Sequence, residues 1–158
     1  MKIDKSKIKV YAVFLLITGV IGGLSALLTN MGMDSYKAAQ KPPLTPPDIV
    51  FPIVWTILFV LMAISAARVW LTDNSRLRNH GIIVYFIQLF FNFFWSILFF
   101  NLKLYFFSFG WLLVLWAMIF FMILSFYKAS KTAALINIPY LAWVAFAGYL
   151  NLGIAILN

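Results

Sequence analysis

Long hydrophobic runs separated by short polar breaks dominate this chain. A helix that crosses the hydrocarbon core of a bilayer needs about 20 mostly apolar residues. Backbone N–H and C=O groups in lipid must pair within the protein, which favours helices over an open sheet. The pattern therefore predicts an all-α integral membrane protein, with residues 1–158 forming a single domain, a bundle of five transmembrane helices. The expected spans are residues 8–29, 49–71, 81–100, 104–127 and 133–157.

The breaks between these spans differ in length. Three are short, and short connections place neighbouring helices antiparallel. The first break, residues 30–48, is long, and a long loop in so small a bundle is usually functional. Within it we expect a short interfacial helix over Met33–Gln40, which brings Tyr36 close to the proline-rich segment that follows.

That segment, Lys41–Trp55, holds five of the six prolines of the chain. Proline fixes φ and lacks an N–H, so we expect stiff, extended backbone here. Pro52 is tolerated in the first turn of a helix, where N–H groups have no intrahelical partner, and Asp48 is a candidate N-cap. We call residues 41–48 the proline strap and predict that it covers a pocket with Trp55 just inside.

Composition excludes a water-soluble domain. Hydrophobic residues make up 65% of the chain and charged residues 10%, with a mean hydropathy of +0.99, whereas soluble domains carry about 45–50% and about 25%. Aromatic residues reach 19%, and contact with lipid and its interfaces accounts for much of this content. The absence of cysteine excludes disulfides and thiolate chemistry. We expect no metal site.

The net charge of +8 is unevenly placed along the chain. With five spans, the N-terminal tail and the second and fourth breaks share one side, which carries nine of the 12 basic residues. The positive-inside rule then predicts a cytoplasmic N-terminus and an outer C-terminus, in the cell membrane if the protein is bacterial. Anionic lipid headgroups are a simpler partner for these charges than nucleic acid, which we do not expect to bind.

Polar side chains inside two spans must point into the bundle, because unpaired amides are costly in lipid. Gln88, Asn92 and Ser96 share one helical face, beside Trp95. In the last span, a second face carries Asn137, Tyr140, Val144, Ala147 and Asn151, with Trp143 and Leu150 adjoining it. Both faces allow two interpretations, which are hydrogen bonding between helices and the wall of a ligand pocket.

Three segments resemble motifs of the translocator protein / tryptophan-rich sensory protein family (TspO/MBR, the peripheral benzodiazepine receptor). They are KPPLTPPDIVFPIVWTILFVLMAISAARVW (41–70), QLFFNFFWSILFF (88–100) and PYLAWVAFAGYLNLGIAIL (139–157). The first and fourth spans agree mainly in hydropathy and length. The resemblance implies a bundle that is commonly dimeric, with a pocket under the first loop for porphyrins such as protoporphyrin IX, haem, isoquinoline carboxamides or benzodiazepines. It also implies light-dependent porphyrin degradation.

The resemblance carries over to individual residues. Trp55 and Trp143 match the two pocket tryptophans and are the candidate catalytic residues for photochemistry. Further matches, together with positions that the chain itself suggests, complete the expected ligand-binding set: Ser25, Leu28, Tyr36, Pro46, Pro47, Phe51, Trp55, Gln88, Asn92, Trp95, Trp143, Ala147, Leu150 and Asn151. The chain departs from the family at Ile49, where many members carry tryptophan. No basic residue follows Tyr149, which weakens the case for sterol binding.

The function expected from these observations is a membrane receptor or carrier for a flat, apolar molecule. No obligatory cofactor is expected, and porphyrin or haem enters as ligand, although the single histidine, His80, is expected on the opposite side. A small transporter and a regulatory or interaction protein are the alternatives. All four acidic residues fall in tails or loops, which argues against proton coupling. No constellation suited to hydrolysis or metal catalysis is evident.

Overall fold

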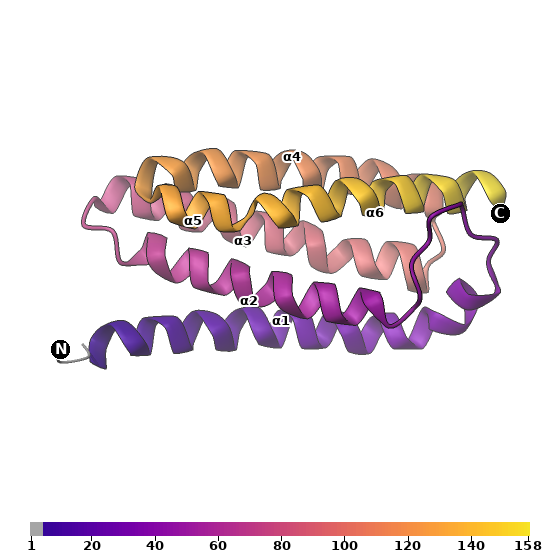
Figure 1. The fold of residues 1–158 in the computed structure, drawn as a ribbon, viewed down its shortest axis with the longest axis horizontal. Helices are drawn as coiled ribbons and strands as arrows, with labels where there is room; N and C mark the ends of the chain where they lie inside the picture. The colour runs from indigo at the N-terminus through magenta and orange to yellow at the C-terminus, as the bar shows by residue number, and fades with distance from the viewer. Residues whose placement is uncertain (1–4) are drawn as a thin grey trace.

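The computed structural model describes residues 5–158, and every regular element in that range is helical. The elements are α1 (Lys5–Ala38), α2 (Val50–Trp70), α3 (Ser75–Ser96), the π-helical turn η1 (Ile97–Asn101), α4 (Tyr105–Ala129), α5 (Lys131–Ile136) and α6 (Ile138–Leu157). They run side by side along the long axis of the molecule (Figure 1). Counting α3 with η1 and α5 with α6 as continuous spans, five are long and apolar enough to cross a membrane. The predicted five-helix membrane bundle is confirmed.

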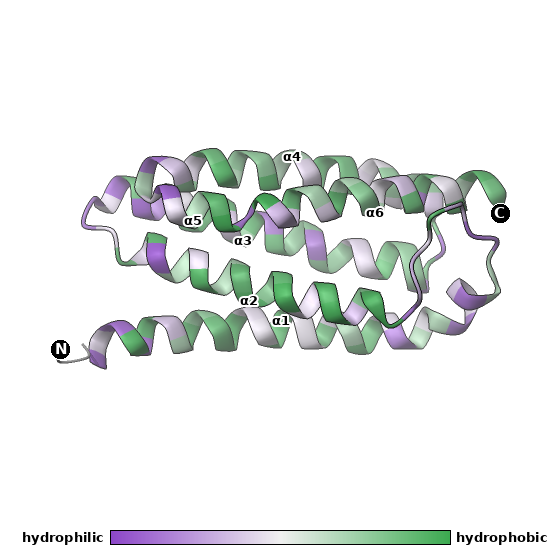
Figure 2. Cartoon of the chain, in the orientation of Figure 1, coloured by the Kyte–Doolittle hydropathy of each residue, from purple (hydrophilic) through white to green (hydrophobic). Residues whose placement is uncertain are grey.

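Small residues bring the helices together in the middle of the bundle. Ala63, Ala66 and Ala67 of α2 have no solvent-accessible surface, and neither does Met62 beside them. Helices in lipid associate through close packing rather than through the hydrophobic effect, so small side chains at contacts favour association. Large apolar side chains such as Leu16 and Phe106 are exposed on the outside instead, and the ribbons of the long helices are coloured largely in the green of apolar residues (Figure 2).

The first helix is longer than the sequence analysis expected. Residues 30–38, predicted to lie in a loop with a separate short helix, continue α1 without a break to Ala38. In this extension Gly32 permits a close approach to η1, because a Cβ at Gly32 would lie 2.2 Å from the carbonyl oxygen of Phe100. Only residues 39–49 therefore connect α1 to α2.

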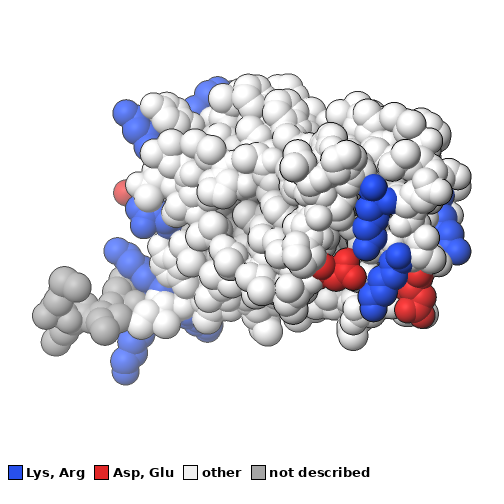
Figure 3. All heavy atoms as spheres, turned by 45° about the vertical axis from the view of Figure 1, so that its right-hand side comes forward, with Lys and Arg blue, Asp and Glu red and all other residues white. Residues whose placement is uncertain are grey.

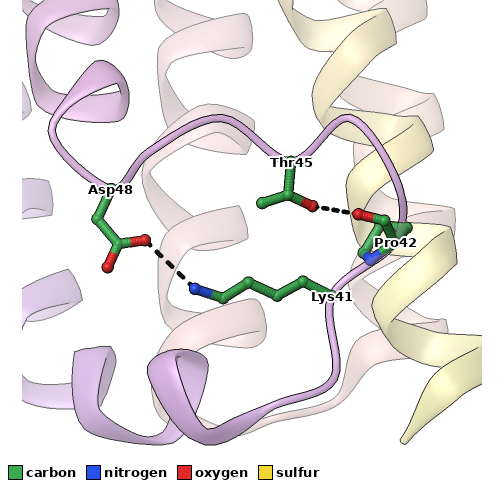
Figure 4. Close-up of polar contacts among 4 residues, drawn as sticks. All are labelled: Lys41, Pro42, Thr45 and Asp48. Carbon is green, nitrogen blue, oxygen red and sulfur yellow. Dashed lines mark hydrogen bonds and ion pairs between the residues drawn. The ribbon is translucent and has the colours of Figure 1, made fainter.

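The start of α2 also differs from the expectation. Ile49 precedes the helix without any side-chain cap, so Asp48 is not the N-cap. Its carboxylate instead accepts from the Lys41 ammonium group at 3.3 Å across the strap (Figure 4). Pro52 does lie in the first turn of α2, as its missing N–H allows.

The strap is not uniformly extended. Leu44 adopts a left-handed backbone conformation with φ of 66°, and the Thr45 hydroxyl donates to the carbonyl oxygen of Pro42 at 2.7 Å (Figure 4). This turn reverses the chain over the end of α6, so the strap crosses the mouth of the bundle close to the C-terminus (Figure 1).

The last span is broken at Asn137, two residues before Pro139. α5 ends at Ile136 and α6 begins at Ile138, so the expected interruption by proline occurs at this point. The Asn137 amide donates to the Ser65 hydroxyl and to the Ala133 carbonyl, both at 2.8 Å. The amide therefore ties the break to α2 and to α5.

Candidate functional site

A cavity of about 190 Å³ lies within the strap end of the bundle. Its walls come from α1, the end of the strap, α2, α3, η1 and α6, whereas no residue of α4 lines it. The strap holds Asp48 at the cavity, which is the one charged residue among the described lining residues. The space is therefore an internal, predominantly apolar chamber near one membrane face.

Seven of the 22 residues that line the cavity are tryptophan or phenylalanine. Trp55 of α2 lies 6.1 Å from Trp95 of α3 between ring centroids, and Trp95 stacks on Phe99 of η1 at 5.6 Å. Trp143 of α6 meets Phe51 of α2 edge-on at 6.0 Å. Three indoles from three different helices thus line one chamber, which offers aromatic faces to a flat molecule.

Hydrogen bonds between helices hold the polar part of the wall in place. The Asn92 amide donates to the Tyr140 hydroxyl at 2.7 Å, and this hydroxyl donates to the Gln88 side-chain oxygen at 2.9 Å. The Trp95 indole N–H donates to the Asn151 side-chain oxygen at 3.1 Å. Asn92, Trp95 and Asn151 also line the cavity, so these side chains both form hydrogen bonds between helices and belong to the cavity wall.

Two buried polar atoms at the cavity lack any partner. The Tyr36 hydroxyl and the Trp143 indole nitrogen are both shielded from solvent, and neither makes a hydrogen bond with the described residues. Leaving a buried polar group unpaired costs about 1–3 kcal/mol. Both belong to residues that line the cavity.

The strap is fastened to α6 on its outer side. The Tyr149 hydroxyl donates to the Pro43 carbonyl at 2.8 Å, and Asn158 exchanges two hydrogen bonds with the backbone of Gln40. Pro42 rests on Gly153, where an added Cβ would lie 2.5 Å from the Pro42 Cβ. The Lys41 ammonium group lies 4.5 Å above the ring of Tyr36, which is a lining residue of the cavity.

The structure brings together most of the residues expected at the site. Ten of the fourteen line the cavity: Ser25, Tyr36, Phe51, Trp55, Asn92, Trp95, Trp143, Ala147, Leu150 and Asn151. The helical faces read from the sequence contributed Asn92, Trp95, Trp143, Ala147, Leu150 and Asn151, whereas Ser25 and Trp55 were expected from the family resemblance. This placement is a matter of geometry, and their role in binding stays a prediction.

Four expected residues do not line the cavity: Leu28, Pro46, Pro47 and Gln88. Gln88 lies behind Tyr140, whose hydroxyl donates a hydrogen bond to the Gln88 side-chain oxygen. Leu28 is placed at the contact with η1, where its carbonyl accepts from the Asn101 amide at 3.0 Å. The strap turns at Leu44, and Pro42 before this turn is its buried residue. Pro46 and Pro47 come after the turn and lie away from the chamber.

Other lining residues were missed. Helical spacing around Ser25 extends its face to Gly22, Ala26 and Thr29, a signal that was available in the sequence. Phe99 and Phe100 enter the wall because η1 is wound as a π-helix, for which no sequence signal is apparent. The remaining lining residues not expected at the site are Asn30, Met33, Asp48, Pro52, Phe59, Ser96 and Ile154.

The fold and this cavity define a small multi-pass integral membrane protein with an enclosed aromatic chamber beneath a short connecting strap. Residues 12–157 match the TspO/MBR family. The tryptophan-rich protein TspO of Chlorobaculum tepidum is 40% identical over 124 residues, covering 78% of each chain. Protein CrtK of Rhodobacter capsulatus is 31% identical over 149 residues, covering 94% of this chain and 92% of its own.

A vertebrate relative shows the same extent of similarity. The translocator protein of Bos taurus is 32% identical over 145 residues, covering 87% of this chain and 83% of its own. The family matches nearly the whole chain, and the similarities to these three relatives cover 78%, 94% and 87% of it. The chain belongs to the TspO/MBR family.

Proposed function

We propose that this protein is a membrane receptor or carrier that binds flat, largely apolar ligands in the cavity beneath the strap. Porphyrins such as protoporphyrin IX are the first candidates, followed by haem and by isoquinoline carboxamide or benzodiazepine-type drugs. One observation carries the proposal, which is the meeting of Trp55, Trp95 and Trp143 in the wall of one chamber.

The energetics favour a ligand with large aromatic faces. Ring stacking contributes about 0.5–1.5 kcal/mol beyond the burial of area, so most of the affinity would come from removing ligand faces from water and lipid. The cavity volume of about 190 Å³ is below the range of about 300–1,000 Å³ that is usual for ligand pockets. A porphyrin therefore requires some lining side chains to move.

The charge distribution supports a cell-membrane location with the strap on the outer side. Among the described residues, Lys and Arg lie at the two ends of the bundle, and an uncharged band separates them on the face shown in Figure 3. Eight basic residues lie at the end opposite the strap: Lys5, Lys7, Lys9, Arg68, Arg76, Arg78, Lys128 and Lys131. The strap end carries Lys37, Lys41 and Lys103. By the positive-inside rule, we propose that the N-terminal end faces the cytoplasm, and a homodimer in the bilayer is the assembly we expect.

Titration of protoporphyrin IX against the intrinsic tryptophan fluorescence of the reconstituted protein tests this function. Trp143→Phe removes one indole and its unpartnered N–H, and we expect binding to weaken about three- to tenfold, since each tenfold change corresponds to 1.4 kcal/mol. Trp116→Phe is the matched control, because Trp116 packs on Phe120 of α4 away from the cavity. Equal weakening by both changes, or no saturable quenching in the wild type, would contradict the proposal.

Breakdown of bound porphyrin in light is a further prediction, with Trp55 and Trp143 as the candidate reactive indoles. Trp55 lies in ring contact with Trp95 and with Tyr140, at 6.1 and 6.2 Å between centroids. Illumination of the loaded protein in the presence of oxygen, with the protein-free porphyrin as reference, measures whether this chemistry occurs.

A further inference from the structure

A second hollow lies on the bilayer-facing surface, in the seam between α1 and α2. Its volume is about 300 Å³, and glycine and apolar side chains form nearly all of its lining. Five of its lining residues are also lining residues of the inner cavity: Gly22, Ala26, Pro52, Trp55 and Phe59. The outer hollow and the inner cavity are therefore adjacent and share a thin wall.

Two aromatic rings make up the bulk of that wall. Phe59 and Trp55 lie one helical turn apart on α2, with ring centroids separated by 5.9 Å. The Phe59 ring lies against the backbone of Gly22, where an added Cβ would be 2.9 Å from the ring. A side chain held against glycine has no interlocking partner on the other helix, so rotation of the Phe59 ring away from Gly22 opens the seam.

Two glycines leave the outer part of the seam without side chains. Gly19 and Gly23 line the outer hollow, and a Cβ added at either glycine would meet no atom within 4 Å. α1 is also the least buried span, with 17% of its most apolar window buried against 28–44% for the other four. Elements with few buried contacts are the ones that open at lowest cost.

We infer that this seam is a lateral portal, through which flat apolar ligands pass from the bilayer into the cavity, with the Phe59 ring as its gate. The inference rests on the proposed function and adds the route of entry. A ligand of this class dissolves in lipid and reaches the seam within the membrane. The strap stays fastened during passage, through its contacts with α6 and the pairing of Lys41 with Asp48.

The volumes support a passage of this kind. The closed cavity alone is smaller than usual ligand pockets, whereas the cavity and the outer hollow joined fall within the range of about 300–1,000 Å³. Opening of the Phe59 gate would therefore admit the ligand and supply the room that it needs. A different groove, between α2 and α6, shares only Trp143 with the cavity, so it is less continuous with the chamber.

Gly23→Leu tests the portal. The change places a side chain in the open outer hollow, and Gly23 does not line the cavity. In proteoliposomes, the rate of protoporphyrin IX association is followed by tryptophan quenching, and dissociation by fluorescence recovery after addition of excess porphyrin-free albumin. We expect both rates to fall about tenfold while the dissociation constant stays within twofold, because an obstructed route raises the barrier without changing the end states.

Three comparisons sharpen this test. Gly110→Leu is the matched control, since a Cβ at Gly110 of α4 also meets open space, and it should retain wild-type rates. Ala142→Leu fills the groove between α2 and α6 and should retain them as well. Phe59→Ala removes the gate and should accelerate association and dissociation together. Gly19→Leu obstructs the same hollow and replaces Gly23→Leu if that variant does not fold.

The outcomes separate the portal from the proposed function. Saturable binding by the wild type together with unchanged rates in Gly23→Leu and Gly19→Leu would overturn the portal and leave the binding function intact. Slowing by Ala142→Leu instead would place the route between α2 and α6 and would also overturn it. Absence of saturable binding in the wild type would overturn both proposals at once.

Discussion

At the scale of single residues, the bundle depends on polar side chains that satisfy one another at membrane depth. Tyr140 is the clearest case, because its fully buried hydroxyl accepts from Asn92 and donates to Gln88. Three helical positions are thereby linked across α3 and α6. Such contacts between membrane helices contribute about 0.6–2 kcal/mol each, which is a substantial part of the stability of a small protein.

Tyr140→Phe should therefore destabilise the fold. The change removes one hydroxyl and leaves the Asn92 amide without its acceptor and the Gln88 oxygen without its donor, at an expected cost of about 1–3 kcal/mol in unfolding free energy. Unfolding of the reconstituted protein in denaturant measures the loss. Tyr127→Phe is the control, because that ring is exposed at the end of α4. Equal stability of the two variants would contradict the interpretation.

Gly32 carries a second residue-level prediction. An alanine there places its Cβ 2.2 Å from the Phe100 carbonyl oxygen, a backbone atom that cannot rotate aside. We expect Gly32→Ala to lose about 1–3 kcal/mol of unfolding free energy from overpacking, even though alanine favours a helix. Gly110→Ala, which meets no atom, should be neutral or stabilising by up to about 1 kcal/mol. A neutral Gly32→Ala would show that α1 and η1 do not approach this closely.

At the scale of elements, the strap and α6 act as one unit. Pro42 is seated on Gly153, Pro43 is held by Tyr149, and Gln40 is held by Asn158. By contrast, the Lys41–Asp48 pair is partly exposed, and exposed pairs contribute only about 0–1 kcal/mol. The contact with α6 is therefore the main fastening of the strap.

Gly153→Leu should release the strap. The larger side chain displaces Pro42, and residues 39–49 should then exchange their amide hydrogens faster, while the helices keep their protection. Hydrogen exchange followed by mass spectrometry reports this difference directly. Gly110→Leu provides the comparison at an open site on α4. If amide hydrogens of the strap in Gly153→Leu exchange at the wild-type rate, the contact with α6 is not what holds the strap in place.

The elements also show how far sequence reasoning reaches. Hydropathy predicted the five spans, because each needs only a long apolar run, and helical periodicity identified the parts of the cavity wall that α3 and α6 supply. The extension of α1 to Ala38 and the π-helical turn η1 were not predicted, and the close approach of the two elements at Gly32 is a tertiary contact that local sequence patterns do not report. Gln88 was placed at the site because periodicity identifies an inward face but does not show which side chain lies behind another.

At the scale of the whole molecule, the protein is a membrane bundle whose one end encloses an aromatic chamber. The chamber is covered by the strap, and a thin wall separates it from the bilayer between α1 and α2. The opposite end carries most of the positive charge. This arrangement agrees with a receptor that takes its ligand from the membrane and retains it near one face.

Filling the chamber tests this account most directly. Ala147 lines the cavity, whereas Ala145 on the same helix is exposed, so Ala147→Leu and Ala145→Leu form a matched pair. The measurement is the dissociation constant of protoporphyrin IX for each reconstituted variant. The account predicts at least about tenfold weaker binding for Ala147→Leu, or 1.4 kcal/mol, and wild-type binding for Ala145→Leu. Equal affinity of both variants would show that porphyrin binds outside the cavity and would contradict the central claim.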